Sequence, residues 1–127
     1  MNISAAAHAA GLPTKTVRYY ADIGLVEPAG RTGSGYRSYD ESSLRKLIFV
    51  RRARDFGFSI TECRELLGLY TDRNRSSADV KRIANKRLEQ IRDKQRELQS
   101  LHDELAYLVE ACHGDERPDC PIIDYLS

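Results

Sequence analysis

Apolar residues recur at helical spacing in two short segments at the start of the chain. The segment ISAAAHAAGL carries small apolar residues and ends at Gly11, and Ser4 is its expected N-cap. The next segment, TKTVRYYADIGL, is expected to form a helix of about ten residues from an N-cap at Thr14 to a stop at Gly24. Two short helices joined by a turn of about three or four residues have the spacing of a helix-turn-helix.

The second of these helices has two different faces. Lys15, Arg18, Tyr19 and Asp22 share a polar, mainly cationic face, while Val17 and Tyr20 share the opposite face, which is expected to pack. A recognition helix needs this division, because its basic and phenolic groups must reach phosphates and base edges. An ordinary amphipathic helix shows the same pattern, so this segment alone leaves both interpretations open.

The segment EPAGRTGSGYRSYD changes from helical spacing to alternation around three glycines, which predicts a β-hairpin with a glycine-rich tip. Arg31 and Arg37 lie on either side of the tip, and Tyr36 precedes the second arginine. Guanidinium groups bind phosphates, and phenolic hydroxyls form oriented hydrogen bonds. The hairpin is therefore predicted to be a wing that contacts DNA through these three side chains.

The segment ISAAAHAAGLPTKTVRYYADIGLVEP, followed by GYRSYD, resembles the N-terminal DNA-binding domain of the MerR family of bacterial transcription regulators. The resemblance implies a mainly α fold in which residues 1–70 form a winged helix-turn-helix domain, with two further helices at 41–57 and 59–70. Asp40 is a suitable cap for the first of these, and Ser59 with Glu62 forms a capping box for the second.

Two other features of these helices have simple interpretations. Cys63 lies on the apolar stripe of the second helix and is expected to be a small buried hydrophobic residue. The arginine cluster Arg51, Arg52 and Arg54 fits either additional phosphate contacts or a solvated helix face.

Residues 76–111 contain no proline or glycine and are rich in charged residues, which predicts a single helix about 50 Å long. Apolar residues fill the a and d heptad positions mainly in its C-terminal half, and Arg87 and Lys94 interrupt the d positions midway. The segment is predicted to be a dimerisation helix. The family resemblance implies an antiparallel coiled coil in a homodimer.

The overall net charge of +1 hides an asymmetry along the chain. Residues 1–75 carry 12 basic and 8 acidic side chains, whereas residues 112–127 carry one basic and four acidic ones. A basic first half suits a phosphate-bearing partner. The odd number of cysteines, the absence of a basic leader and the absence of a long apolar segment favour a cytoplasmic protein with no membrane partner.

Cys112 and Cys120 enclose seven residues at the end of the long helix. Two thiolates are soft donors that suit a monovalent ion such as Cu(I). Zinc usually takes four ligands, for which the loop offers His113, Asp115, Glu116 and Asp119. A pair of buried thiols or a disulfide that closes the loop also fits this spacing, so the residues alone leave these alternatives open.

The segment ACHGDERPDCPIIDYL resembles the metal-binding loop of the copper-efflux subgroup of MerR regulators. The resemblance implies that Cys112 and Cys120, within a metal-binding segment 112–127, hold one Cu(I), Ag(I) or Au(I) ion. It implies that an apolar helical turn covers the ion, with Ile122, Ile123 and Leu126. In SSADVKR, Ser77 stands where zinc-responsive relatives place a third cysteine, which favours monovalent ions.

Two thiolates and one monovalent cation leave a net negative charge, which needs compensation in an apolar pocket. The turn at 121–126 offers helix N-terminal amides, and Lys81, one helical turn after Ser77, is a basic candidate. In the antiparallel dimer that the resemblance implies, Ser77 and Lys81 of one subunit lie near the cysteine loop of the other.

The resemblance implies a function as well as a fold. The homodimer is expected to bind double-stranded promoter DNA with or without metal, and metal loading is expected to distort the DNA so that RNA polymerase engages the promoter. An enzyme is not expected, because His8, His102 and His113 have no recognisable catalytic arrangement. A zinc-responsive or divalent-metal regulator and a thiol-redox regulator remain the alternatives.

Overall fold

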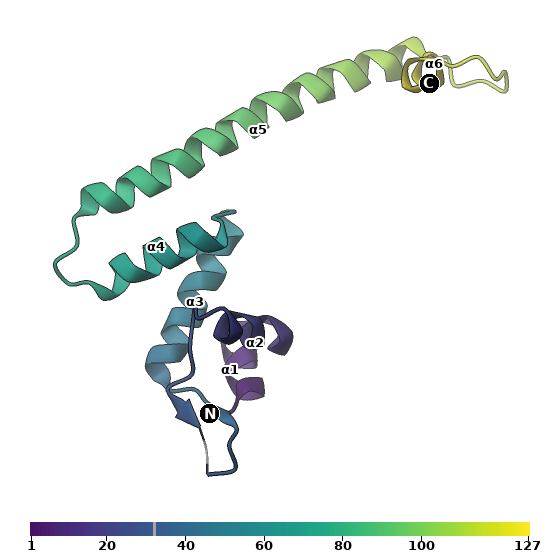
Figure 1. Ribbon diagram of the computed structural model, residues 1–127. Coiled ribbons are helices and arrows are strands. Elements are labelled where there is room, and N and C mark those ends of the chain that lie inside the picture. Colours follow the sequence, from purple (N-terminus) through teal and green to yellow (C-terminus); the bar gives the residue numbers. More distant parts are fainter. Residues whose placement is uncertain (32) are drawn as a thin grey trace. The chain divides into compact units, whose positions relative to one another are not determined.

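The computed structural model describes residues 1–31 and 33–127. These residues form two compact units, Met1–Arg87 and Leu88–Ser127. Six helices and two strands make up the described chain (Figure 1), with the bounds α1 Ile3–Ala10, α2 Thr14–Asp22, β1 Gly30–Arg31, β2 Arg37–Ser38, α3 Glu41–Asp55, α4 Ile60–Thr71, α5 Ser77–Ala111 and α6 Pro121–Leu126. None of the described helices combines the length and apolar character needed to cross a membrane.

The first two helices form the expected pair, but both predicted N-caps are wrong. The side chain of Asn2 caps α1 by accepting a hydrogen bond of 2.8 Å from the amide of Ala5, so Ser4 lies inside the helix. Helix α2 begins at Thr14 itself, after Pro13, and has no side-chain cap. The fixed backbone of Pro13 already directs the chain into the helix, so the hydroxyl of Thr14 is not needed as a cap.

Helix α1 packs against both α2 and α3, and α3 packs against α4 (Figure 1). The core between them consists of small and branched apolar side chains together with two tyrosines. Its fully buried members include Val17 of α2, Leu47 and Val50 of α3, and Tyr39 after β2. The first turns of α5 also reach this core, because Ile83 is 4% exposed.

Strands β1 and β2 form an antiparallel pair in which Gly30 faces Ser38 and Arg31 faces Arg37. The predicted hairpin is therefore present in its two strands. Part of its predicted glycine-rich tip, at Thr32, lies outside the described residues. Gly35 has φ +84°, a left-handed conformation that favours glycine, and it returns the chain to β2.

Helices α3 and α4 begin at the predicted caps. The carboxylate of Asp40 accepts a hydrogen bond of 2.8 Å from the amide of Ser43. Ser59 and Glu62 form the predicted capping box at the start of α4. Helix α3 ends two residues before the predicted Gly57, because Gly57 takes φ +85° and turns the chain into the next helix.

Three helix ends in the first unit are held by arginines that come from other helices. Arg51 of α3 donates to the carbonyl of Ala10 at the end of α1, with an N–O distance of 3.1 Å. Arg64 of α4 donates to carbonyls after α2, and Arg87 of α5 donates to the carbonyl of Phe56 after α3. Each of these ends is followed by a glycine with positive φ, at positions 11, 24 and 57. This repeated contact fastens the helices of the unit to one another through their C-terminal ends.

The second unit contains the rest of α5, a loop and the short helix α6. The long helix ends at Ala111, as predicted, and begins at Ser77, one residue later than predicted. Leu98, Leu101 and Leu105 are more than half exposed along it, while Leu108 is buried. The division into segments 1–70, 76–111 and 112–127 remains a prediction, as does the coiled-coil pairing of α5.

Candidate DNA-binding surface and thiol site

A groove of about 740 Å³ lies between the start of α1, helix α2 and the hairpin. Its lining includes four of the six residues predicted to contact DNA, namely Arg18, Arg31, Tyr36 and Arg37. The other two, Lys15 and Tyr19, are exposed on α2. The fold thus brings residues from two separate elements to one surface rich in basic side chains, which is the arrangement that a nucleic-acid contact requires.

The two tyrosines of the GYRSY segment take different environments. Tyr36 is 72% exposed, whereas Tyr39 is 1% exposed and belongs to the core. Burial raises the pKa of the Tyr39 hydroxyl above its ordinary value. Tyr36 is therefore the hairpin tyrosine that is exposed for contact with a partner, and Tyr39 anchors the hairpin to the core.

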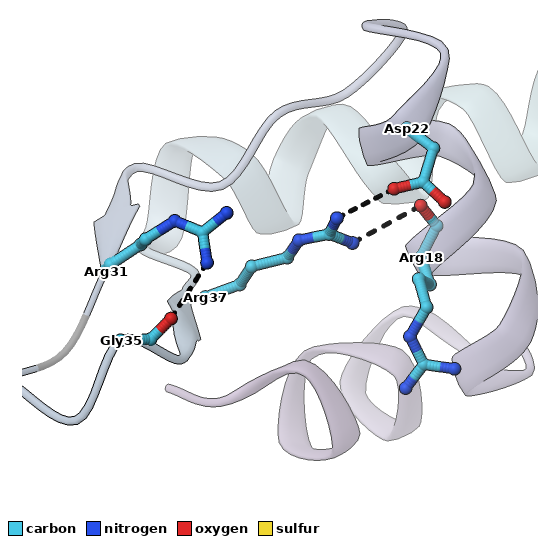
Figure 2. Close-up of polar contacts among 5 residues, drawn as sticks. All are labelled: Arg18, Asp22, Arg31, Gly35 and Arg37. Atoms are coloured by element: carbon cyan, nitrogen blue, oxygen red, sulfur yellow. Dashed lines mark hydrogen bonds and ion pairs between the residues drawn. The ribbon is translucent and has the colours of Figure 1, made fainter.

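The two hairpin arginines make different contacts (Figure 2). Arg31 donates a hydrogen bond of 2.8 Å to the carbonyl of Gly35 across the hairpin. Arg37 extends to α2, where it forms an ion pair of 2.7 Å with Asp22 and donates to the carbonyl of Arg18 at 3.5 Å. The guanidinium of Arg18 points away from this contact (Figure 2). Arg37 therefore holds the hairpin against the predicted recognition helix.

The sulfurs of Cys112 and Cys120 are 3.4 Å apart. This distance is well above the roughly 2.05 Å of a disulfide, and both cysteines are free and partly buried. Cys112 directly follows α5, and Cys120 is the N-cap of α6, with Pro121 at the first position of that helix. The loop between them thus returns the chain so that two thiols eight positions apart meet.

The environment of Cys120 favours its thiolate. The amide of Ile123 lowers the pKa of Cys120 most, followed by the hydrogen bond with Cys112 and the amide of Ile122. These amides lie at the start of α6, where backbone N–H groups have no partner within the helix. The chemistry of the pair fits a soft metal ion, because the thiolate is the form that binds metal.

The other candidate ligands of the loop are not gathered at this pair. Asp115 instead accepts three hydrogen bonds from Arg117, one from its amide at 2.9 Å and two from its guanidinium at 3.2 and 2.9 Å. His113 is exposed. Within residues 1–31 and 33–127, no group of three or more His, Cys, Asp and Glu side chains has the arrangement of a metal site.

The apolar cover expected over the thiol pair remains a prediction. Ile122 is half-buried, whereas Ile123 and Leu126 are 64% and 73% exposed. Ser77 and Lys81 are exposed at the start of α5. Their expected role beside a partner's cysteine loop remains a prediction.

The third cysteine is separate in both place and chemistry. Cys63 is fully buried in α4, as predicted, and its Sγ lies 3.9 Å from the carbonyl oxygen of Phe58. Burial raises the pKa of its thiol. It is a core residue of the first unit.

Sequence reasoning missed the residues that hold the DNA-facing elements in place. Asp22 was assigned only to the polar face of α2, and Arg64 received no role. A signal was present, because an acidic residue in the last turn of a helix opposes the helix dipole and calls for a cation from elsewhere. Arg51 and Arg54 of the arginine cluster donate to the carbonyls of Ala10 and Phe58, which neither proposed interpretation included.

Two family profiles match this chain and together cover most of it. The profile described as "MerR HTH family regulatory protein" matches residues 1–69, and the one described as "MerR, DNA binding" matches residues 44–108. The chain belongs to the MerR family. Members of the MerR family are DNA-binding transcription regulators, and the predicted mainly helical fold with a helix-turn-helix and a long C-terminal helix is confirmed.

Individual relatives narrow the position within the MerR family. The HTH-type transcriptional regulator HmrR of Rhizobium leguminosarum bv. viciae is 54% identical over 127 residues, covering 100% of this chain and 98% of the relative. The HTH-type transcriptional regulator CueR of Salmonella typhimurium is 46% identical, covering 100% and 92%. These similarities support an HmrR/CueR-like MerR subgroup.

A solved structure agrees with this placement. The transcription regulator PbrR691 from Ralstonia metallidurans CH34, in complex with lead(II), matches with a TM-score of 0.83 and 32% identity. The match covers 100% of this chain and 99% of that chain.

Proposed function

We propose that this protein is a metal-responsive transcription regulator that senses Cu(I), and also Ag(I) or Au(I), through Cys112 and Cys120. The observation that carries the proposal is the approach of the two thiols to 3.4 Å at the first turn of α6. Two soft donors without a gathered third ligand among the described residues suit a monovalent soft ion better than zinc. A bound ion would connect the end of α5 to the start of α6 through its two sulfur ligands.

The electrostatics of the site support this assignment. A dithiolate with one monovalent cation carries a net negative charge, which is costly where water is excluded. The amides of Ile122 and Ile123, in the first turn of α6, lower the pKa of Cys120 and would offset part of that charge. Lys81 and Ser77 are proposed to complete the site from the partner subunit of a homodimer.

The first unit is proposed to bind promoter DNA through the groove between α2 and the hairpin. Lys15, Arg18 and Tyr19 would face the duplex from α2, and Arg31 and Tyr36 from the hairpin. Arg37, the sixth residue predicted to contact DNA, would act by holding the hairpin on α2 through Asp22. The exposed leucines of α5 support its pairing with a second copy, because an apolar stripe on a helix of 35 residues is otherwise left in water. The homodimer would act in the cytoplasm and reach RNA polymerase indirectly, through distortion of the promoter.

Regulation requires that the two DNA-bound conformations differ in their affinity for the ion. A ligand shifts an equilibrium only by its differential affinity for the two states. Cys112 and Cys120 are therefore proposed to bind the ion more tightly in the conformation that distorts DNA and activates copper-efflux or detoxification genes.

The test of the ion is X-ray absorption at the metal edge on protein loaded anaerobically with Cu(I), together with zinc competition at buffered free-metal levels. We expect a shell of two sulfurs without nitrogen, and no displacement by zinc. A shell of three or four donors that includes nitrogen, or preferential retention of zinc, would overturn the Cu(I) assignment. The Cys63→Ala variant is the matched control and should bind the ion as the unmodified chain does.

The test of the regulatory role is Cys112→Ser in transcription from a target promoter. We expect this variant to keep its DNA affinity and to lose the response to metal. A loss of DNA affinity in the absence of metal would contradict the proposal that the first unit binds DNA and the second unit senses the metal.

Two observations favour alternative inducers. The similarity to a regulator solved with lead(II) favours a divalent ion, and the zinc competition above distinguishes that case.

The 3.4 Å approach of two free thiols favours a disulfide-forming redox sensor. Mass measurement after mild oxidation and reduction identifies a redox sensor. The protein mass would fall by two hydrogens on oxidation and return on reduction, and transcription from the target promoter would change with it.

A further inference from the structure

The C-terminal end of α2 has an unfavourable charge distribution. Its last turn contains Asp22 and no basic residue. A helix C-terminus carries a partial negative charge, so an acidic residue there is destabilising unless a cation lies close by. The helix predicted to read DNA therefore depends on groups from other elements to fix this end.

Two arginines supply that charge from different elements. Arg37 of the hairpin binds the carboxylate of Asp22 (Figure 2). Arg64 of α4 donates through Nη2 to the carbonyl of Ile23 at 3.0 Å and through Nη1 to the carbonyl of Gly24 at 3.1 Å. The planar fork of a guanidinium fits two such acceptors at once, whereas an ammonium group donates from a single point.

The geometry of Arg64 differs from that of a phosphate contact. Both of its terminal nitrogens donate to backbone oxygens after α2. Arg64 is not among the residues that line the groove with Arg18 and Tyr36. It instead lies beside the turn where Gly24, at φ +69°, leads the chain away from the helix.

We propose that Arg64 is a positioning residue for DNA recognition, which fixes the C-terminal end of α2 against α4 without contacting the duplex. The inference rests on the proposed role of α2 in reading DNA. Without Arg64, the end of α2 would lose two hydrogen bonds and one of its two cations, and the base-reading residues at positions 15, 18 and 19 would lose their fixed orientation.

The test compares Arg64→Gln and Arg64→Lys with Arg73→Gln, which removes one charge from an exposed arginine on the α4–α5 connection. The probes are a duplex selected by the unmodified full chain from a random-sequence pool and a scrambled duplex of the same composition. Affinity for both is measured over a series of salt concentrations, beside the thermal unfolding midpoint of each variant.

We expect Arg64→Gln to bind the selected duplex about tenfold more weakly, because contacts to bases depend on exact orientation of the helix. Its affinity for the scrambled duplex and its salt dependence should match those of Arg73→Gln. Arg64→Lys should lie between Arg64→Gln and the unmodified chain, because lysine keeps the charge but not the fork.

Three results would overturn the inference. A loss shared equally by both duplexes, with the slope of log K against log salt reduced by about one, would make Arg64 a phosphate contact. A loss that follows only the unfolded fraction would give it a purely structural role. Affinities equal to those of Arg73→Gln would give it no role. If the unmodified chain selected no duplex, the proposed function itself would fail.

Discussion

Nε of Arg87 on α5 donates a hydrogen bond of 2.7 Å to the carbonyl oxygen of Phe56, at the end of α3. The same guanidinium occupies the space beside Gly57, where an added Cβ would lie 2.1 Å from Nη2 of Arg87. Gly57 has φ +85°, a left-handed conformation that favours glycine, and any side chain there would displace the guanidinium of Arg87. This contact fastens the start of the predicted dimerisation helix to the turn between α3 and α4.

The first prediction concerns the free energy of unfolding at this contact. Arg87→Ala should cost about 1 to 2 kcal/mol, because the carbonyl of Phe56 loses a charged donor. Gly57→Ala should cost at least about 1 to 2 kcal/mol from its left-handed backbone alone. In an Arg87→Ala background, Gly57→Ala should cost less, because the clash with the guanidinium is gone. Urea denaturation of the four proteins measures this coupling.

Gly68 provides the control for that cycle. It lies inside α4, and an added Cβ there meets no heavy atom of the described residues within 4 Å. Gly68→Ala should therefore stabilise the protein by roughly 0.5 to 1 kcal/mol. Additive effects of Gly57→Ala and Arg87→Ala would contradict the predicted coupling.

The second prediction concerns pH and the capping box of α4. The amide of Ser59 donates to the carboxylate of Glu62 at 2.9 Å and holds the pKa of Glu62 below its ordinary value of 4.5. Because the pKa of Glu62 is lower in the folded state, its ionised carboxylate stabilises the folded protein above pH 4.5. This stabilisation is lost as the pH falls through the folded-state pKa. The unmodified chain should therefore lose more stability on acidification than Glu62→Gln, which cannot titrate at this position.

Chemical denaturation between about pH 6 and pH 3 measures this difference, since carboxyl groups titrate in that range. The other carboxyl groups, Asp40 included, titrate in both proteins and cancel in the comparison. Parallel pH profiles for the two proteins would show that the hydrogen bond to Ser59 does not stabilise the folded state.

The third prediction concerns the reactivity of the cysteines in metal-free, reduced protein. Cys120 should react first with iodoacetamide near neutral pH, because backbone amides lower its pKa and enrich its thiolate. Cys63 should react last, because it is fully buried and burial raises its pKa. Peptide mapping by mass spectrometry over time gives the order. Modification of Cys63 before unfolding would contradict the described core.

The fourth prediction concerns the ion pair of Arg37 and Asp22. If Arg37 acts by holding the hairpin on α2, then Asp22→Asn should weaken binding to the selected duplex, although it removes a negative charge. The loss should be up to about 1 kcal/mol, because both side chains are partly exposed. The double variant with Arg37→Gln should bind no more weakly than Arg37→Gln alone. An additional loss in the double variant, or tighter binding by Asp22→Asn, would favour direct contact of Arg37 with phosphate.

The sequence pattern predicted some helix caps correctly and others wrongly. The caps at Asp40 and Ser59 were predictable, because a capping side chain binds an amide only three residues further along the chain. The residue types in one short segment therefore predict the cap. The caps at Ser4 and Thr14 were predicted wrongly, because the neighbouring Asn2 and Pro13 fix the starts of α1 and α2. Local signals of similar strength compete at helix ends, and the helix boundary shifts by one or two residues as a result.

The sequence by itself determined the order of the helices, the two strands of the hairpin, the burial of Cys63 and the length of α5, because each depends on periodicity or on residues close in the chain. The tertiary structure alone decided which distant groups meet. Arg64 reaches Gly24 across 40 residues, and Arg37 reaches Asp22 across 15. An arginine pattern looks the same whether the side chain meets a phosphate, water or a carbonyl oxygen. Only the packing of the helices brings particular helix ends within reach of particular guanidinium groups, and so decides among these partners.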